Sequence, residues 1–139
     1  GRITAHDVEL MVADDQEQNL FAFIDEVSAR RRGPALASLR RLLDEGQAAT
    51  YILFMVARQV RVLLGVKELA AQRLRPEEIA ARLGQKPFVV RKALEQERGF
   101  SDADLLRLHD RVLELDQATK TGRFEAAAGL ELLVAELCA

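Results

Sequence analysis

The hydrophobic positions of the chain recur with the spacing of α-helices. The longest apolar stretch, from Gln47 to Gln72, contains no proline and one glycine. As a single helix its 26 residues would span about 39 Å. Its first part, Tyr51 to Ala57, is apolar on every side, which is typical of a helix surrounded by other helices. We therefore expect a central helix around which the rest of the domain packs.

The second part of this stretch carries one polar stripe, which we expect to face solvent or a partner. The stripe follows i, i+3, i+7, i+10, i+14 spacing and consists of Arg58, Arg61, Gly65, Glu68 and Gln72, opposite Val60, Leu63, Leu64 and Val66. Gly65 costs the helix about 1 kcal/mol relative to alanine. Such a glycine is expected to admit a closely packed neighbouring helix.

Two helices are expected near the start of the chain. The first covers Ile3–Val12, and residues 13–16 then break its hydrophobic period. The second begins near Asn19, ends in the basic run Arg30–Arg32 and is stopped by Gly33. Its apolar face consists of Leu20, Phe23, Ile24 and Val27.

A third helix precedes the central one. Pro34 is its expected first residue, and Gly46 its expected terminator. Its buried stripe consists of Leu36, Leu39, Leu42 and Leu43. Because almost no loop separates this helix from the central one, the two are expected to pack antiparallel.

Two short helices, each opened by a proline, follow the central helix. They cover Pro76–Leu83, closed by Gly84, and Pro87–Arg98, closed by Gly99. Ser101 and Asp104 then cap a longer helix that buries Leu105, Leu108, Val112 and Leu115 and extends to Gly122. The last helix buries Leu130, Leu133, Val134 and Leu137. The sequence predicts an all-α bundle of about eight helices.

The composition is that of an ordinary globular domain. Of the 139 residues, 30% are charged and 49% hydrophobic, and 20 basic against 22 acidic residues give a net charge of −2. This balance provides no overall attraction for nucleic acid. A membrane span is excluded, because the apolar run Ala48–Ala57 is too short for the roughly 20 residues that a bilayer needs. A single cysteine, Cys138, favours a reducing, cytoplasmic setting.

The short helices around Gly84 form the sharpest local motif. Their pattern resembles a helix-turn-helix, in which the second helix enters the major groove of DNA. Its candidate base contacts are Gln85, Lys86, Arg91 and Lys92, although Glu95 and Glu97 share that helix. A DNA-binding module of a transcription regulator is therefore an alternative function. The same geometry is also common in helical packing.

Other chemistry is not indicated. The arginines at 30–32, 40 and 41 are flanked by acidic residues, which favours a solvated helix end. His6 and His109 are isolated, so no metal site is expected. Neither a GxxxxGK[ST] loop nor a GxGxxG motif occurs, so no nucleotide cofactor and no catalytic activity are expected.

Taken in order, the segments resemble the C-terminal part of the delta subunit of bacterial DNA polymerase III, a component of the clamp loader. The resemblance rests on ITAHDVELMV, NLFAFIDEV, ALASLRRLLDEG, VARQVRVLLGVKEL, RPEEIAARLGQKPFVVRKAL, RGFSDADLLRLHDRVLELDQATKTG and LELLVAELCA. It extends over nearly the whole chain. The family's delta subunit is not a working ATPase, which agrees with the missing phosphate loop.

The resemblance implies a division of the chain and a role. Residues 1–16 would be the tail of an upstream helical, lid-like domain with its linker, and residues 17–139 a helical collar domain that joins the other clamp-loader subunits. The sliding clamp and primer-template DNA would be met only through the complex or through an upstream domain that has no counterpart here. Arg58 and Arg61 are the candidate partner contacts, because arginine is favoured at interfaces.

Overall fold

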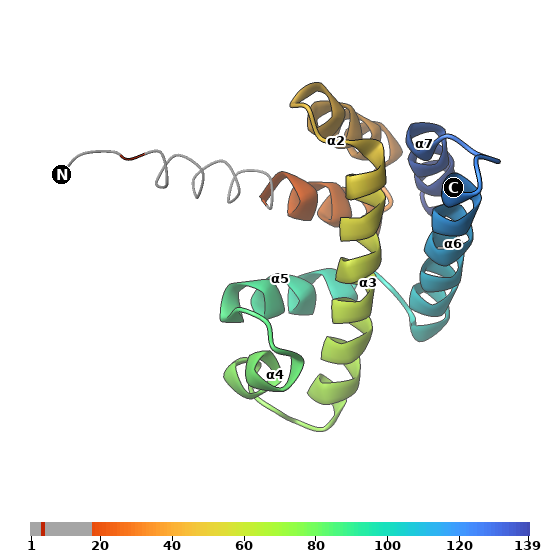
Figure 1. The fold of residues 1–139 in the computed structure, drawn as a ribbon. Helices are drawn as coiled ribbons and strands as arrows, with labels where there is room; N and C mark the ends of the chain where they lie inside the picture. Colours follow the sequence, from red (N-terminus) through yellow and green to blue (C-terminus); the bar gives the residue numbers. More distant parts are fainter. Residues whose placement is uncertain (1–3, 5–17) are drawn as a thin grey trace.

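Residue 4 and residues 18–139 are described in this computed structural model (Figure 1). Among the described residues, 18–28 form the first helix. It is followed by α2 (Arg32–Asp44), α3 (Ala49–Ala71), α4 (Pro76–Leu83), α5 (Pro87–Glu97), α6 (Asp102–Lys120) and α7 (Ala126–Leu137). These seven helices, with no strand among the described residues, confirm the all-α class, although about eight were predicted. Apart from residue 4, the helix expected over residues 3–12, its linker and His6 lie outside the described residues.

Helix α3 is the centre of the fold, as predicted. It runs between the pair α6 and α7 on one side and α4, α5 and the helix over residues 18–28 on the other (Figure 1). Its buried face consists of Ile52, Leu53, Val56, Val60, Val62, Leu63 and Val66. By length and composition α3 could also cross a bilayer. The core helix of a globular protein can have the same length and composition. Here the residues of this buried face pack against the other helices of the domain.

Two expectations about the start of α3 are wrong. The segment from Tyr51 to Ala57 is not enclosed on all sides, because Tyr51 is 49% and Phe54 56% exposed. Helix α2 packs chiefly against α7 rather than antiparallel to α3 (Figure 1). The left-handed Gly46 (φ +91°) turns the chain between α2 and α3. With α2 directed away, no helix of the described chain covers these two rings.

The first described helix ends differently from the prediction. Arg30, not Gly33, adopts the left-handed conformation that ends it, with φ +58°. The amides of Arg30 and Arg31 bond the carbonyls of Val27 and Glu26 at 3.0 and 2.9 Å, the pattern of a Schellman motif. Helix α2 consequently begins at Arg32, two residues before the expected Pro34.

The later helix boundaries agree with the sequence signals. Gly84 closes α4 with φ +64°, and Ser101 and Asp104 form a reciprocal capping box at α6. Gly65 does admit a close neighbour, since a Cβ atom there would lie 3.0 Å from the Leu83 side chain of α4. Gly99 likewise permits contact with Ser28, whose carbonyl oxygen would be 2.5 Å from a Cβ atom at position 99.

A buried polar network fixes α5 against α3 and the first described helix. Gln59 donates to Oε1 of Gln96 at 3.0 Å, and Gln96 donates to the Phe21 carbonyl at 3.2 Å and to Asp25 Oδ1 at 2.9 Å. Gln59 and Gln96 are only 4% and 1% exposed. Buried amides require partners, so the network favours one orientation of the three helices.

Candidate partner-binding surface

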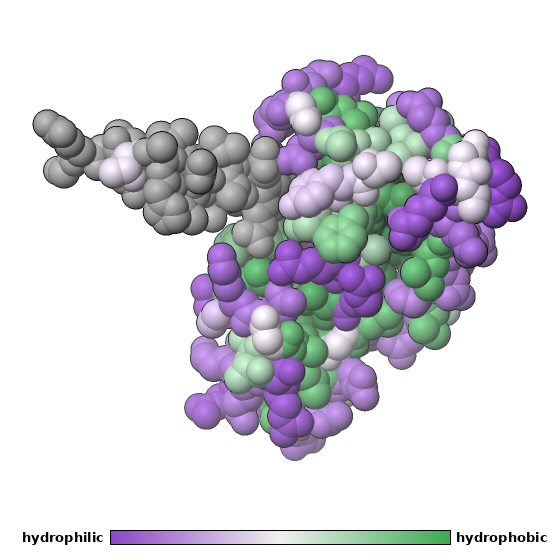
Figure 2. All heavy atoms as spheres, in the orientation of Figure 1, coloured by the Kyte–Doolittle hydropathy of each residue, from purple (hydrophilic) through white to green (hydrophobic). Residues whose placement is uncertain are grey.

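One face of α3 is exposed over the first half of the helix. Tyr51, Phe54, Arg58 and Arg61 follow i, i+3, i+7, i+10 spacing, and we call these four residues the α3 stripe. The rings of Tyr51 and Phe54 stack with centroids 6.5 Å apart. Figure 2 shows apolar surface open over the upper half of α3, next to strongly hydrophilic side chains. The α3 stripe therefore combines an exposed aromatic pair with two arginines.

The two predicted contact residues have different surroundings. Arg58 is partly buried, and its Nη2 donates to Oε1 of Gln85 at 3.1 Å. Arg61 is exposed and forms no ion pair with any residue that the structure describes. An unpaired guanidinium retains all its donors for a carboxylate of a partner. The structure brings Arg58 and Arg61 onto one surface.

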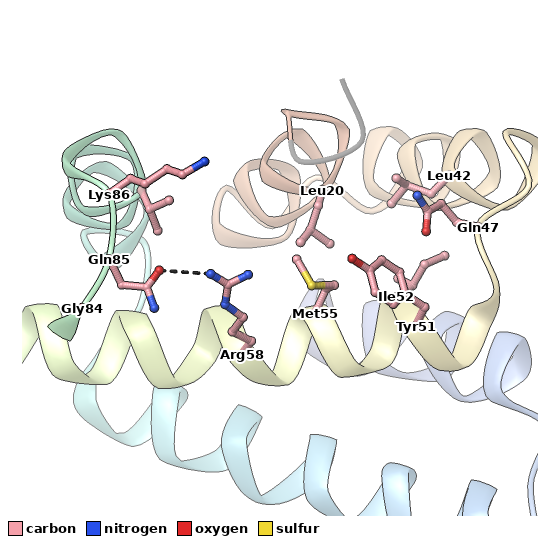
Figure 3. Close-up of a pocket in the computed structure, with 11 residues that line it drawn as sticks. Leu20, Leu42, Gln47, Tyr51, Ile52, Met55, Arg58, Gly84, Gln85 and Lys86 are labelled. Atoms are coloured by element: carbon pink, nitrogen blue, oxygen red, sulfur yellow. Dashed lines mark hydrogen bonds between the residues drawn. The ribbon is translucent and has the colours of Figure 1, made fainter. Parts of the chain in front are cut away.

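A cleft of about 340 Å³ lies beside the α3 stripe (Figure 3). Its apolar lining consists of Leu20, Leu42, Ile52, Met55 and Val89. The polar lining consists of Gln47, Tyr51, Arg58, Gln85 and Lys86, with Gly84 at the turn between α4 and α5. The described residues of the lining thus include two cations and no carboxylate. Arg58 and Tyr51 belong to both the cleft and the α3 stripe.

The helix-turn-helix alternative is not supported by the positions of its candidate base contacts. Gln85 accepts the hydrogen bond from Arg58. Lys92 faces the first described helix, with Nζ 3.9 Å from Oδ2 of Asp25. Only Lys86 and Arg91 are exposed, so the four side chains do not form a common DNA-reading face.

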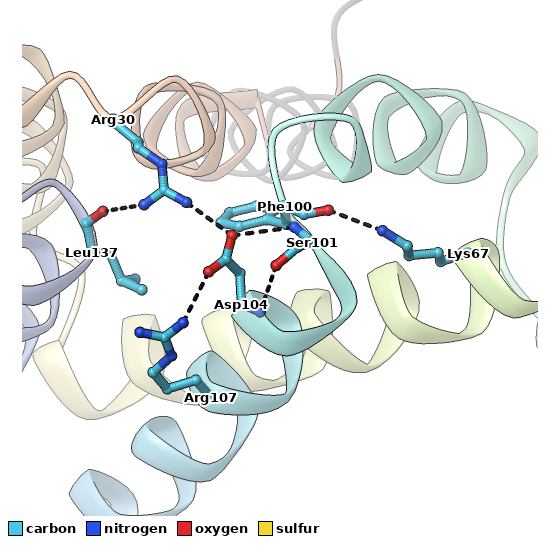
Figure 4. Close-up of polar contacts among 7 residues, drawn as sticks. All are labelled: Arg30, Lys67, Phe100, Ser101, Asp104, Arg107 and Leu137. Atoms are coloured by element: carbon cyan, nitrogen blue, oxygen red, sulfur yellow. Dashed lines mark hydrogen bonds and ion pairs between the residues drawn. The ribbon is translucent and has the colours of Figure 1, made fainter.

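The basic run at residues 30–32 contributes to a junction of three helix ends (Figure 4). Arg30 donates to the Leu137 carbonyl at 2.8 Å and to Asp104 Oδ2 at 2.9 Å, and Arg107 donates to Asp104 Oδ1 at 3.1 Å. The hydrogen bond from the Ser101 amide, more than the nearby arginines, lowers the pKa of Asp104. Arg30 is therefore a structural residue, and not merely a solvated helix end.

The described residues contain no group of three or more His, Cys, Asp or Glu side chains that could hold a metal ion. His109 is partly buried, with Nδ1 3.7 Å from Asp110 Oδ1. Cys138 is partly buried and unpaired, and burial raises the pKa of its thiol.

Sequence reasoning missed Tyr51 and Phe54 as surface residues. Their signal was present, because continuing the stripe backwards from Arg58 by four and seven residues reaches Phe54 and Tyr51. Their apolar character led instead to the prediction of a fully enclosed segment. Lys86 was noted only as a base contact, since its place in the cleft depends on how α5 packs.

Comparison with known proteins agrees with the predicted resemblance. The family model described as the C-terminal domain of the DNA polymerase III delta subunit matches residues 17–137. The DNA polymerase III subunit delta of Bacillus subtilis (strain 168) is 32% identical over 135 residues, which are 97% of this chain and 39% of that protein. The structure of the Bacillus subtilis DNA clamp loader delta protein (YqeN) has a TM-score of 0.85 and 31% identity, covering 96% of this chain and 39% of that one. The chain thus spans about two fifths of the length of these relatives. It belongs to the family of the C-terminal domain of the DNA polymerase III delta subunit.

Proposed function

We propose that this domain assembles the delta subunit into a bacterial clamp loader, the complex that opens and loads the sliding clamp on DNA. In this proposal residues 17–139 form the collar domain, which joins the collars of the other loader subunits. Residues 1–16 are the tail of an upstream helical domain. The family match, which begins at residue 17, supports this division. The sliding clamp and DNA are reached through the rest of the complex.

The α3 stripe carries the proposal. Tyr51 and Phe54 are about half exposed. Large aromatic side chains contribute most to the stability of a fold or an interface when they are buried, so these two rings are suited to being covered by a partner. Aromatic residues and arginine are the types enriched in protein interfaces and among their energetic hot spots. Arg61 adds an unpaired planar donor beside them, suited to a carboxylate on the partner. A neighbouring helix laid along α3 would cover all three side chains.

The domain itself is proposed to be non-catalytic. Its relatives are delta subunits, and the exposed features described above are suited to contacts between proteins rather than to chemistry. Polymerase and ATPase activities would reside in other subunits of the complex.

Size-exclusion chromatography with purified partners tests the proposal. The chain is mixed at micromolar concentration with the collar regions of the ATPase subunits and of the delta-prime-like subunit from the same organism. We expect the wild-type chain to co-elute with them. The double variant Phe54→Glu, Arg61→Glu should bind at least about tenfold more weakly, which is about 1.4 kcal/mol. The double variant Arg58→Glu, Arg61→Glu should be similarly impaired.

Two controls separate the parts of the proposal. Arg91→Glu makes the same charge change at an exposed arginine of α5 outside the α3 stripe, and should co-elute like the wild type. Circular dichroism should show unchanged helicity in every variant. If the wild-type chain never co-elutes, the assembly role is wrong for this domain. If it co-elutes and the stripe variants do too, assembly occurs through another surface.

A further inference from the structure

We propose that the cleft between α3, α5 and the first described helix binds an acidic segment of a partner protein. The segment would insert one bulky apolar side chain and place a carboxylate against Arg58 and Lys86. This site goes beyond the assembly role and does not require it. Lys86 and Met55 belong to the cleft but not to the α3 stripe, whereas Phe54 and Arg61 belong only to the stripe.

The floor of the cleft accounts for the apolar part of the segment. Leu20, Ile52 and Val89 are 5%, 2% and 3% exposed, so the floor is closed by the core beneath it. Met55 is partly buried, and its side chain extends from α3 toward Leu20, as that of Tyr51 does (Figure 3). Methionine adapts to differently shaped apolar partners. The volume of about 340 Å³ is at the lower end of the range for ligand pockets, which suits a single anchoring side chain.

The charges at the rim account for the acidic part. Most buried or half-buried cations of the domain face a carboxylate, as Lys67, Lys92 and Arg111 do. At the cleft, Arg58 instead donates to the neutral amide of Gln85, and Lys86 forms no ion pair with the described residues. Among the described residues the two cations therefore lack a negative partner. A carboxylate between them would form charge-assisted hydrogen bonds at the edge of an apolar site, where such bonds are stronger than in water.

A protein segment suits these features better than a nucleic acid does. Single-stranded nucleic acids are held by several cations along the backbone and by aromatic rings that stack on the bases. Here two cations border an aliphatic floor, and Tyr51 is the one aromatic ring that the described part of the chain places in the lining. The chain also has a net charge of −2, which gives no general attraction for phosphates.

The test uses a phage-displayed library of random 12-residue peptides, selected on the wild-type chain and counter-selected on Lys86→Glu. We expect enriched peptides to share a bulky apolar residue within one helical turn of Asp or Glu. A fluorescein-labelled enriched peptide should bind with micromolar affinity, measured by fluorescence anisotropy. Lys86→Glu should weaken this binding about tenfold or more, and replacing the peptide's carboxylate by its amide should have a similar effect.

Matched variants locate the site and keep it apart from the assembly surface. Arg91→Glu on the same helix and Phe54→Glu with Arg61→Glu on the α3 stripe should change peptide affinity less than about twofold, a fraction of the 1.4 kcal/mol that a tenfold change represents. Lys86 is exposed, so its variant should retain the wild-type melting temperature. The proposal is overturned if no peptide is enriched over the variant, or if the enriched peptides lack carboxylates.

Two further results would assign the cleft to another occupant and so also overturn the proposal. One is salt-sensitive binding of a labelled oligonucleotide that Lys86→Glu abolishes while no peptide binds. The other is self-association of the chain, seen by sedimentation velocity, that the same variant abolishes. Loss of co-elution in the assembly experiment with intact peptide binding would reject only the assembly role.

Discussion

Replacing the buried glutamines Gln59 and Gln96 by leucine, singly and together, measures how strongly they fix the helices of the domain. Gln96→Leu leaves the buried amide donor of Gln59 without its acceptor, and Gln59→Leu leaves Oε1 of Gln96 without its donor. An unsatisfied buried polar group costs about 1–3 kcal/mol. We therefore expect each single variant to lose about 2 kcal/mol of unfolding free energy.

The double variant should be less unstable than the sum of the two singles. Both orphaned groups disappear, and two leucines of similar volume face each other, which can be nearly neutral. The remaining loss is that of the Gln96 bonds to Phe21 and Asp25, and Asp25 is partly exposed and can be rehydrated. A double variant that costs about 1–2 kcal/mol gives a coupling energy of about 2–3 kcal/mol.

Urea unfolding followed by circular dichroism provides the free energies, and thermal melts provide a second measure. For a chain of this length 1 kcal/mol corresponds to about 3 °C in melting temperature, so each single variant should melt about 6 °C lower. Gln117→Leu, at an exposed glutamine of α6, is the control and should stay within about 0.5 kcal/mol of the wild type. Strict additivity, or single variants that match this control, would refute the reasoning.

The remaining predictions concern two glycines and one carboxylate. Gly99→Ala should lose about 1–3 kcal/mol of unfolding free energy in urea, because its Cβ atom would overlap the Ser28 carbonyl, which belongs to the backbone and cannot move aside easily. At Gly33 an added Cβ atom would meet no other atom within 4 Å. Gly33→Ala should therefore leave the unfolding free energy unchanged or raise it by up to about 1 kcal/mol. Equal effects of Gly99→Ala and Gly33→Ala would contradict the packing argument. Asp104→Asn should lower the melting temperature most at pH values above 3.8, the ordinary carboxyl pKa. The pKa of Asp104 is lowered in the folded state, so its contacts stabilise the fold only while the carboxylate is ionised. The difference from the wild type should shrink as the pH falls through that lowered pKa, and a difference that stays constant down to pH 2 would show that ionisation of Asp104 is not the cause.

Local signals predicted the second half of the fold well. The proline and glycine that bound α4, and the Ser101–Asp104 box that opens α6, act through neighbouring backbone groups and need no knowledge of distant residues. The end of the first described helix was less predictable, because Arg30 occupies a conformation usually given to glycine. Its side chain stabilises this conformation through hydrogen bonds to Asp104 and Leu137, which lie 74 and 107 positions further along the chain.

The candidate surface was only partly predictable, because it also depends on residues far apart in the sequence. The spacing of Arg58 and Arg61 indicates a common face, but whether Tyr51 and Phe54 are covered depends on the direction that α2 takes after Gly46. Gln59, between a polar and an apolar neighbour, gives no sign of burial in the sequence. Its partner is supplied by α5, 37 residues later.

The packing of the first described helix against α7 has a consequence for synthesis of the protein on the ribosome. Phe23 and Val27 line the same core space as Leu133 and Leu137, and Arg30 bonds a carbonyl 107 residues further along. At about 5–20 residues per second, the ribosome needs roughly 5–20 s to make the intervening chain. Throughout that interval the apolar face of the early helix has no native partner from α7. Exposed apolar surface of this kind is prone to aggregation, and the native packing of the early helix is completed only after α7 has been made.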